Sequence, residues 1–322
     1  MSIQSQPRVA VIGGGVIGVS SAYHLARNGA KVWLVTEGAL GSGASGRSLS
    51  WINSASGWSE HYHQFRMIGI DRYRTLLAGQ PGVDWLRFDG GLMWQPTEQV
   101  QTFRELHAHA VAHGYDSQLL TPNQVAARIP GVNPAAIPAA GGIWNPGEGW
   151  VDLPSLISYL VAQLVELGGE LITNAGKASV NAEASRVRTI STASYGAITV
   201  DAALLATGSH VPQMVAKFGV NIPDATNTAL LIKTSPVETQ LRAVLNTPRV
   251  SLRPAPNGGL AVDAGWTESQ IEELADGTYR VPAETINELL AEASYVLSGT
   301  PSLSAGSYGI GPKPIPGDGE PV

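Results

Sequence analysis

A glycine pattern near the N-terminus has the spacing of a dinucleotide-binding turn. Gly13, Gly15 and Gly18 follow the apolar run 8–12 and open a predicted helix over 16–28. In this context the first glycine permits a tight turn, the second lets a pyrophosphate approach the backbone, and the third lets the helix pack on the strand. The free amides at the start of the helix then face the phosphate charge. The predicted cofactor contacts here are Gly13, Gly15, Ile17 and Gly18.

An acidic residue completes this pattern. Glu37 lies 22 residues after Gly15, just past a second predicted strand over 31–35. A carboxylate at this place accepts hydrogen bonds from the ribose hydroxyls of an adenosine. It also disfavours a 2′-phosphate, because two negative charges would be brought together.

A loop of small and hydroxyl residues follows at once over 41–48. A nicotinamide-binding domain normally continues from its second strand into another helix and strand, so this loop favours FAD over NAD. Ser42, Ser45 and Ser48 have hydroxyls that can donate to phosphate or ribitol oxygens, and Arg47 can offset pyrophosphate charge. We predict all four as cofactor contacts.

Composition excludes several other classes of protein. The 322 residues contain no cysteine, which excludes disulfides, thiolate metal sites, a cysteine nucleophile and a cofactor attached through sulfur. The net charge of −6 comes with no basic stripe, so nucleic acid is not an expected partner. No signal peptide or membrane span is expected, because the longest apolar stretch near the N-terminus is far shorter than about 20 residues. The sequence predicts a cytoplasmic protein.

The order of predicted elements indicates an α/β fold with interleaved domains. A strand, a helix and a strand open the chain over 8–35, and helices are predicted over 59–77, 98–113, 122–129, 152–167 and 282–297. Short strands over 171–200 form a small antiparallel meander between two buried strands. Further strands are predicted at 88–95, 141–146, 202–206, 229–234, 250–253 and 260–264, and the Pro- and Gly-rich tail 309–322 is predicted to be irregular or extended.

Six segments in order give the chain a resemblance to a known family. They are VAVIGGGVIG at 9–18, Glu37, GSGASGRS at 41–48, GEGWVDLPSL at 147–156, LLATG at 204–208 and GPKPIPGDGEP at 311–321. With them the chain resembles the FAD-dependent amine and amino-acid oxidoreductases, which include D-amino-acid oxidase, glycine oxidase and monomeric sarcosine oxidase.

The resemblance implies a Rossmann-like FAD-binding domain with an interleaved α+β substrate domain built on a mixed or antiparallel sheet. The implied FAD-binding domain is discontinuous, over 1–85, 141–222 and 306–322, and the substrate domain takes 86–140 and 223–305. By the same resemblance, Ala178 offers its backbone to the adenine, and Thr207 and Gly208 pass close to the cofactor.

The implied reaction is oxidation of the C–N bond of a small amine or amino acid. In such enzymes a C–H next to the nitrogen delivers hydride to flavin N5, the imine hydrolyses, and oxygen or an electron carrier takes the electrons. The sequence identifies no catalytic acid–base pair. The seven histidines form no metal-ligand set at a recognisable spacing, so no metal is expected.

Three residues are candidates for binding the substrate. Family members place an arginine before the proline of the last motif, where it clamps the substrate carboxylate, and Lys313 stands there in this chain. An ammonium supplies charge without the planar fork of a guanidinium. Arg253 is a second candidate cation, and Tyr308 is a candidate hydroxyl partner.

The resemblance also implies noncovalent FAD. No cysteine is present for a sulfur linkage, and Ile52 follows Trp51 where some family members carry the histidine that attaches the flavin.

Family members continue beyond the last motif with a strand and a helix that face the flavin, whereas this sequence stops at Val322. We therefore expect either a truncated product or a second chain that completes the flavin site. Two alternatives stay open at this point: a non-catalytic relative or subunit, and an NAD-dependent dehydrogenase.

Overall fold

The computed structural model describes residues 6–55 and 57–318, and these residues form two compact units. Unit 1 contains the described residues of 6–48, 153–228 and 311–318, and unit 2 those of 49–152 and 229–310. The end of the last motif and of the predicted FAD-binding domain, at 319–322, lies outside the described residues.

The observed division differs from the predicted one mainly over 49–85 and 141–152, which belong to unit 2. The reason is one small antiparallel sheet, in the order β3-β8-β4. Its strands are β3 (Trp51–Ile52), β8 (Gly149–Val151) and β4 (Leu86–Arg87). Because β3 and β4 both pair with β8, these distant stretches form one body.

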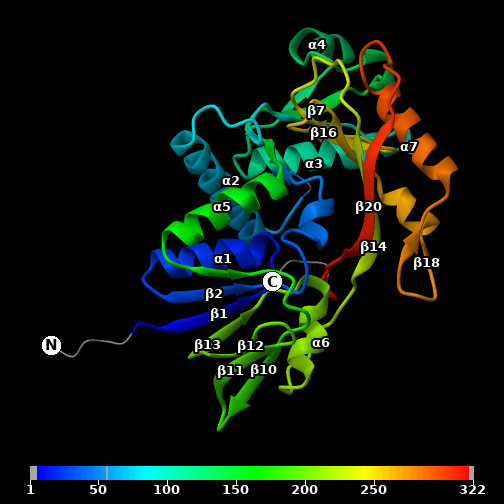
Figure 1. Cartoon of the computed structure of the whole chain (residues 1–322). Helices are drawn as coiled ribbons and strands as arrows, with labels where there is room; N and C mark the ends of the chain where they lie inside the picture. Colours follow the sequence, from blue (N-terminus) through cyan, green and yellow to red (C-terminus); the bar gives the residue numbers. More distant parts are fainter. Residues whose placement is uncertain (1–5, 56, 319–322) are drawn as a thin grey trace. The chain divides into compact units, whose positions relative to one another are not determined.

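Unit 1 is built on a four-stranded parallel sheet in the order β13-β1-β2-β9. The opening strand, helix and strand are β1 (Arg8–Ile12), α1 (Val16–Arg27) and β2 (Lys31–Val35). Strand β1 pairs in parallel with β2 on one side and with β13 (Ala202–Leu205) on the other, so its apolar residues are buried. Figure 1 shows α1 running along these strands.

A second helix packs on α1 in the same unit, namely α5 (Leu153–Glu166). After α5 the chain adds β9 (Glu170–Ile172) to the sheet and then forms the predicted meander. Its strands are β10 (Ser179–Glu183), β11 (Arg186–Thr192) and β12 (Gly196–Thr199), which pair antiparallel. The short helices of unit 1 are η1 (Ala44–Arg47), η4 (Gly208–His210) and α6 (Val211–Ala216).

Unit 2 is built on an eight-stranded mixed sheet in the order β20-β14-β17-β16-β15-β5-β7-β6. Most of its pairs are antiparallel, and β15 with β5 is parallel. The strands, in sheet order, are β20 (Ala305–Lys313), β14 (Asn227–Thr234), β17 (Leu260–Asp263), β16 (Ser251–Pro254), β15 (Val244–Asn246), β5 (Gly91–Met93), β7 (Gly142–Asn145) and β6 (Gln118–Leu120). The tail predicted to be irregular or extended begins as an extended segment, since its residues up to 313 belong to β20.

The helices of unit 2 are α2 (Glu60–Gly79), α3 (Val100–Ala112), α4 (Pro122–Arg128) and α7 (Ala283–Tyr295). Short 3₁₀ helices η2 (Thr97–Gln99), η3 (Pro134–Ala136) and η5 (Gly265–Gln270) connect strands, and β18 (Glu272–Glu273) pairs with β19 (Tyr279–Arg280). All four helices fall within two residues of their predicted bounds.

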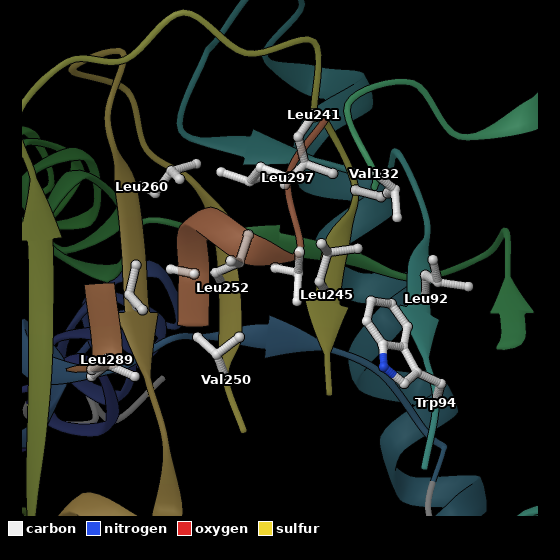
Figure 2. Close-up of a cluster of buried hydrophobic side chains, with 14 of the residues drawn as sticks. Leu92, Trp94, Val132, Leu241, Leu245, Val250, Leu252, Leu260, Leu289 and Leu297 are labelled. Carbon is white, nitrogen blue, oxygen red and sulfur yellow. The ribbon is translucent and has the colours of Figure 1, made fainter. Parts of the chain in front are cut away.

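The main core of unit 2 lies against the large sheet (Figure 2). Leu92 of β5, Leu245 of β15, Leu252 of β16 and Leu260 of β17 are fully buried there with Leu289 of α7. Alternating residues of the strands therefore pack against one face of α7 and form a single apolar layer.

The architecture is a mixed α/β fold, as predicted. None of the helices in the described part of the chain has the length and apolar composition needed to span a membrane.

Candidate functional site

Unit 1 contains a cavity of about 830 Å³ at the carboxyl end of its parallel sheet. Such a volume lies in the range of about 300–1,000 Å³ that is usual for small-molecule and cofactor sites. The predicted residues on its wall are Gly13, Gly15, Ile17, Glu37, Ser42, Ser45, Arg47, Ser48, Ala178, Thr207 and Gly208. The cavity brings these residues together from five separate stretches of the chain.

Two glycines make the turn between β1 and α1 possible. Gly13 has a φ of +124°, and a Cβ there would lie 2.2 Å from the carbonyl oxygen of Ala206. Gly18 lies behind the wall, where a Cβ would meet the carbonyl oxygen of Gly13 at 1.9 Å. The turn thus depends on backbone packing that any side chain would disrupt, and it leaves open space in front of the helix.

Loop 41–48 is fixed against this turn by hydrogen bonds. The Gly41 N–H donates to the Gly14 carbonyl over 2.9 Å, and the Ser45 hydroxyl accepts from the Val16 N–H over 3.0 Å. Val16 is the first residue of α1, so Ser45 satisfies one of the free amides there. The loop and the positive end of the α1 dipole together form one wall suited to a phosphate.

The charged side chains of the wall are Glu37, Arg47 and Lys177. Arg47 Nη1 donates to the Ser42 carbonyl over 2.6 Å, which closes the loop on itself. A Cβ on Gly311 would lie 2.4 Å from Arg47 Nη2, so this glycine leaves room for the guanidinium. A single acid at the end of β2 and a guanidinium beside the helix start match the ribose and pyrophosphate groups of a dinucleotide.

Several wall residues were not found from the sequence. They are Lys177 before β10, His210, Gln213 and Met214 at η4 and α6, and Pro312 and Pro314 around the end of β20. The Thr207 hydroxyl donates to Met214 Sδ over 3.2 Å, which holds α6 next to the wall. Pro312 and Pro314 belong to the last motif, whereas Lys177, His210, Gln213 and Met214 lie in none of the quoted motifs, so the fold alone reveals these four.

The three predicted substrate-binding residues lie in different places. Lys313 is exposed at the end of β20 in unit 1, between the two wall prolines, and is not itself a wall residue. Tyr308 is 53% exposed on the part of β20 that belongs to unit 2, whereas Arg253 of β16 is only 1% exposed. In the sheet, β14, β17 and β16 follow β20 in that order, so Tyr308 and Arg253 are not on neighbouring strands.

A buried carboxyl group in unit 2 was also not singled out from the sequence. Glu148, just before β8, is fully buried and accepts hydrogen bonds from the Tyr115 hydroxyl at 2.7 Å, Trp51 Nε1 at 2.8 Å and Asn145 Nδ2 at 3.0 Å. Burial raises the pKa of Glu148 to about 8, and these three hydrogen bonds oppose the rise. All three hydrogen-bond donors to Glu148 are neutral, and the charge of Arg66 also opposes the rise.

The Glu148 network extends to a histidine on α2. Tyr115 accepts from the Ser54 N–H over 3.0 Å, and the Ser54 hydroxyl lies 2.8 Å from His63 Nδ1. Burial and the nearby Glu148 raise the pKa of Tyr115 above its usual range, while burial lowers the pKa of His63. Across residues 6–55 and 57–318, no three acidic or histidine side chains are grouped as a metal site requires.

Comparison with curated proteins places these features in a family context. The chain is 23% identical over 372 residues to a D-amino acid dehydrogenase of Agrobacterium fabrum, an alignment that covers 98% of this chain and 87% of that protein. It is 25% identical over 223 residues to a glycine oxidase of Geobacillus kaustophilus, covering 66% of this chain and 58% of that protein.

Solved structures show the same fold. The glycine oxidase of Geobacillus kaustophilus superposes with a TM-score of 0.82 at 20% identity, covering 98% of this chain and 85% of that one. The L-amino acid deaminase of Proteus vulgaris gives 0.81 at 15% identity, covering 100% and 86%.

The sequence model of the DAO family, which is described as FAD dependent oxidoreductase, matches residues 8–322 of the chain. That match spans the strand, turn and loop that form the cavity. The chain belongs to the DAO family of FAD-dependent oxidoreductases.

Proposed function

We propose that this protein holds FAD noncovalently in the cavity of unit 1 and oxidises the C–N bond of a small amino acid or amine. The observation that carries the proposal is the cavity itself, because its wall combines the glycine turn, the α1 N-terminus, Glu37 and the loop 41–48. The relatives named as a D-amino acid dehydrogenase and a glycine oxidase support an amino acid as the substrate class.

The residues of unit 1 bind and orient the cofactor. The amides at the start of α1 and the guanidinium of Arg47 receive the pyrophosphate charge, and the Glu37 carboxylate accepts from the ribose hydroxyls. Ala178, Thr207 and Gly208 border the same cavity and limit where the rest of the cofactor lies. These groups position the cofactor without taking part in bond making.

The bound flavin supplies the hydride acceptor for the reaction. The substrate C–H bond breaks and its hydrogen leaves with both electrons, while the carbon–nitrogen bond becomes double. Water then adds to that double bond and releases the amine and an oxo product. Oxygen or an electron carrier takes up the two electrons. The substrate-binding roles expected of Lys313 and Tyr308 stay predictions.

The cytoplasmic location predicted from the sequence stays a prediction. The match to a family of FAD-dependent oxidoreductases favours FAD over the NAD alternative.

The test begins with the visible absorbance spectrum of the purified protein. We expect a flavin spectrum, and we expect acid precipitation to release FAD into the supernatant, because the attachment is noncovalent. Anaerobic addition of glycine, D- and L-amino acids and N-methylated amines in turn should bleach the flavin with one of these classes.

The variant Gly69→Ala serves as a control for a substitution in the other unit. Gly69 lies in α2 of unit 2, and a Cβ added there would meet no atom within 4 Å. This variant should bind FAD as the wild type does.

Absence of flavin from the wild type even after FAD is added would contradict cofactor binding. A flavin that stays oxidised with every amine in the panel would contradict the proposed chemistry and favour the non-catalytic alternative.

A further inference from the structure

Arg253 is the largest side chain that is fully buried in the described structure. Its guanidinium is surrounded by groups of unit 2. Nε donates to the carbonyl of Leu49, Nη1 donates to the carbonyl of Pro254 over 2.8 Å, and Nη2 forms an ion pair with Asp152 at 3.3 Å. The ring of Trp150 lies 5.0 Å from the guanidinium carbon. The Arg253 guanidinium therefore has polar or aromatic partners on several sides within unit 2.

The charge of Arg253 is balanced inside the unit. Burial lowers the pKa of this guanidinium, while Asp152 and the nearby Asp263 oppose that effect. A guanidinium stays charged in proteins, and a buried charge without a partner is strongly destabilising. A lysine ammonium lacks the planar fork that reaches a carboxylate and two carbonyls in different directions. The planar shape of the guanidinium, as well as its charge, therefore suits arginine to this position.

The carbonyl that Arg253 binds belongs to an unusual piece of backbone. Ser50, the next residue after Leu49, has a φ of +56°, in the left-handed region that residues with a side chain seldom adopt. The Ser50 carbonyl accepts from the Val151 N–H over 3.2 Å, and Trp51 then pairs with Trp150 between β3 and β8. Such a conformation persists only where the surroundings hold it.

This backbone continues directly from the cofactor loop. Ser48 lines the cavity of unit 1, and Leu49 is the residue bonded to it. The conformation of residues 49–51 therefore limits the conformations open to the end of the loop that contains Ser45, Arg47 and Ser48.

We propose that Arg253, paired with Asp152, is a positioning residue that fixes residues 49–51 through the Leu49 carbonyl and thereby holds the loop 41–48 in its cofactor-binding conformation. The proposal deepens the proposed function, because it takes the cavity of unit 1 as the FAD site. It assigns Arg253 a contact with backbone, where the sequence suggested a contact with substrate.

The test uses the double variant Arg253→Met with Asp152→Asn, compared with Arg253→Met alone. The double variant removes both members of the buried ion pair, so it regains stability relative to the single variant. It cannot bind the Leu49 carbonyl. We expect amide hydrogen exchange over residues 42–52 to be about tenfold faster than in the wild type, and the FAD dissociation constant to rise about tenfold, in both variants.

The control is Arg280→Met. Arg280 forms an ion pair with Glu272 between β18 and β19 at 67% side-chain exposure, so the same chemical change occurs at the surface of the same unit. Hydrogen exchange over 42–52 and the FAD dissociation constant should equal those of the wild type.

Three outcomes would overturn the proposal. The first is wild-type exchange over 42–52 in the double variant. The second is an FAD dissociation constant that recovers together with thermal stability in the double variant, which would show a general loss of stability. The third is unchanged FAD binding with a raised KM for carboxylate-bearing substrates, which would return Arg253 to a substrate contact. If the wild type bound no FAD, the proposed function would fail, and the exchange measurement would still judge whether Arg253 holds the loop.

Discussion

The two units use opposite means to build a polar site. In unit 1 the cavity is formed by glycines and backbone amides, and its ion pairs, such as Arg8 with Asp201, lie at the surface. In unit 2 titratable side chains are buried, with Arg253 paired to Asp152 and Glu148 accepting hydrogen bonds from Tyr115, Trp51 and Asn145.

This difference follows from what each region has to do. A site for a large charged cofactor needs space and donors that are already in place, and backbone amides provide both without a side chain of their own. A buried charged side chain fills its own space and must be satisfied by its neighbours. The first kind of site fails when volume is added, and the second fails when a partner or a proton is changed.

The largest effect should come from adding one methyl group to unit 1. Gly18→Ala places a Cβ against the Gly13 carbonyl, so the turn must move. We expect the free energy of unfolding to fall by about 3 kcal/mol and FAD to be lost on gel filtration. Urea unfolding and the flavin content of the eluted protein measure the two effects.

Gly69→Ala makes the same change in α2, where a Cβ meets nothing within 4 Å. It should leave the flavin content unchanged and stabilise the helix by about 0.5–1 kcal/mol. Equal losses in the two variants would contradict the view that close backbone packing sets the cofactor turn.

The next effect should be a change in pH dependence in unit 2. The pKa of Glu148 is raised from 4.5 to about 8 in the folded protein, so the unfolded chain releases this proton first as the pH rises. The free energy of unfolding therefore falls between pH 4.5 and about 8. Glu148→Gln removes this contribution, and relative to the wild type it should gain about 3 kcal/mol between pH 5 and pH 8 in urea unfolding.

Glu98→Gln provides the comparison, because Glu98 is an exposed acid of the same unit. Its unfolding free energy should follow the pH profile of the wild type. A Glu148→Gln profile parallel to the wild type would mean that Glu148 is ionised throughout and would remove this part of the contrast between the units.

A smaller effect is expected at the acid of the cavity wall. Glu37→Gln keeps an acceptor for the ribose hydroxyls but removes the charge that strengthens those hydrogen bonds. We expect the FAD dissociation constant to rise about fivefold, close to 1 kcal/mol, with no change in unfolding of the FAD-free protein. Fluorescence titration with FAD measures the change, and Glu183→Gln on the exposed strand β10 should bind as the wild type does. A loss of FAD binding as large as that of Gly18→Ala would show that charge, and not space, dominates this site.

The sequence predicted the cavity of unit 1 better than the polar network of unit 2, for a physical reason. Gly13, Gly15 and Glu37 act through local backbone geometry, so their spacing along the chain determines their positions in space. Glu148 and Trp51 meet through the two-residue strand β3 and the three-residue strand β8, which are too short to show any periodicity. Likewise, the sequence showed a cation at Arg253 but not that its partner is the Leu49 carbonyl, 204 residues away.

The smallest effect should come from the exposed ion pair of unit 1. Arg8 lies 2.8 Å from Asp201, with side-chain exposures of 42% and 51%, and hydrogen bonds from Arg8 lower the pKa of Asp201 to about 2. A depressed carboxyl pKa stabilises the folded state above the unfolded value of 3.8 and loses this effect as the pH falls through about 2. Asp201→Asn should therefore lower the Tm only slightly at pH 7, and the difference should shrink in 1 M salt, where charges are screened within about 3 Å. A Tm loss in Asp201→Asn that equals that of Arg253→Met and persists in high salt would show that exposed and buried pairs contribute alike, and the contrast between the two units would not hold.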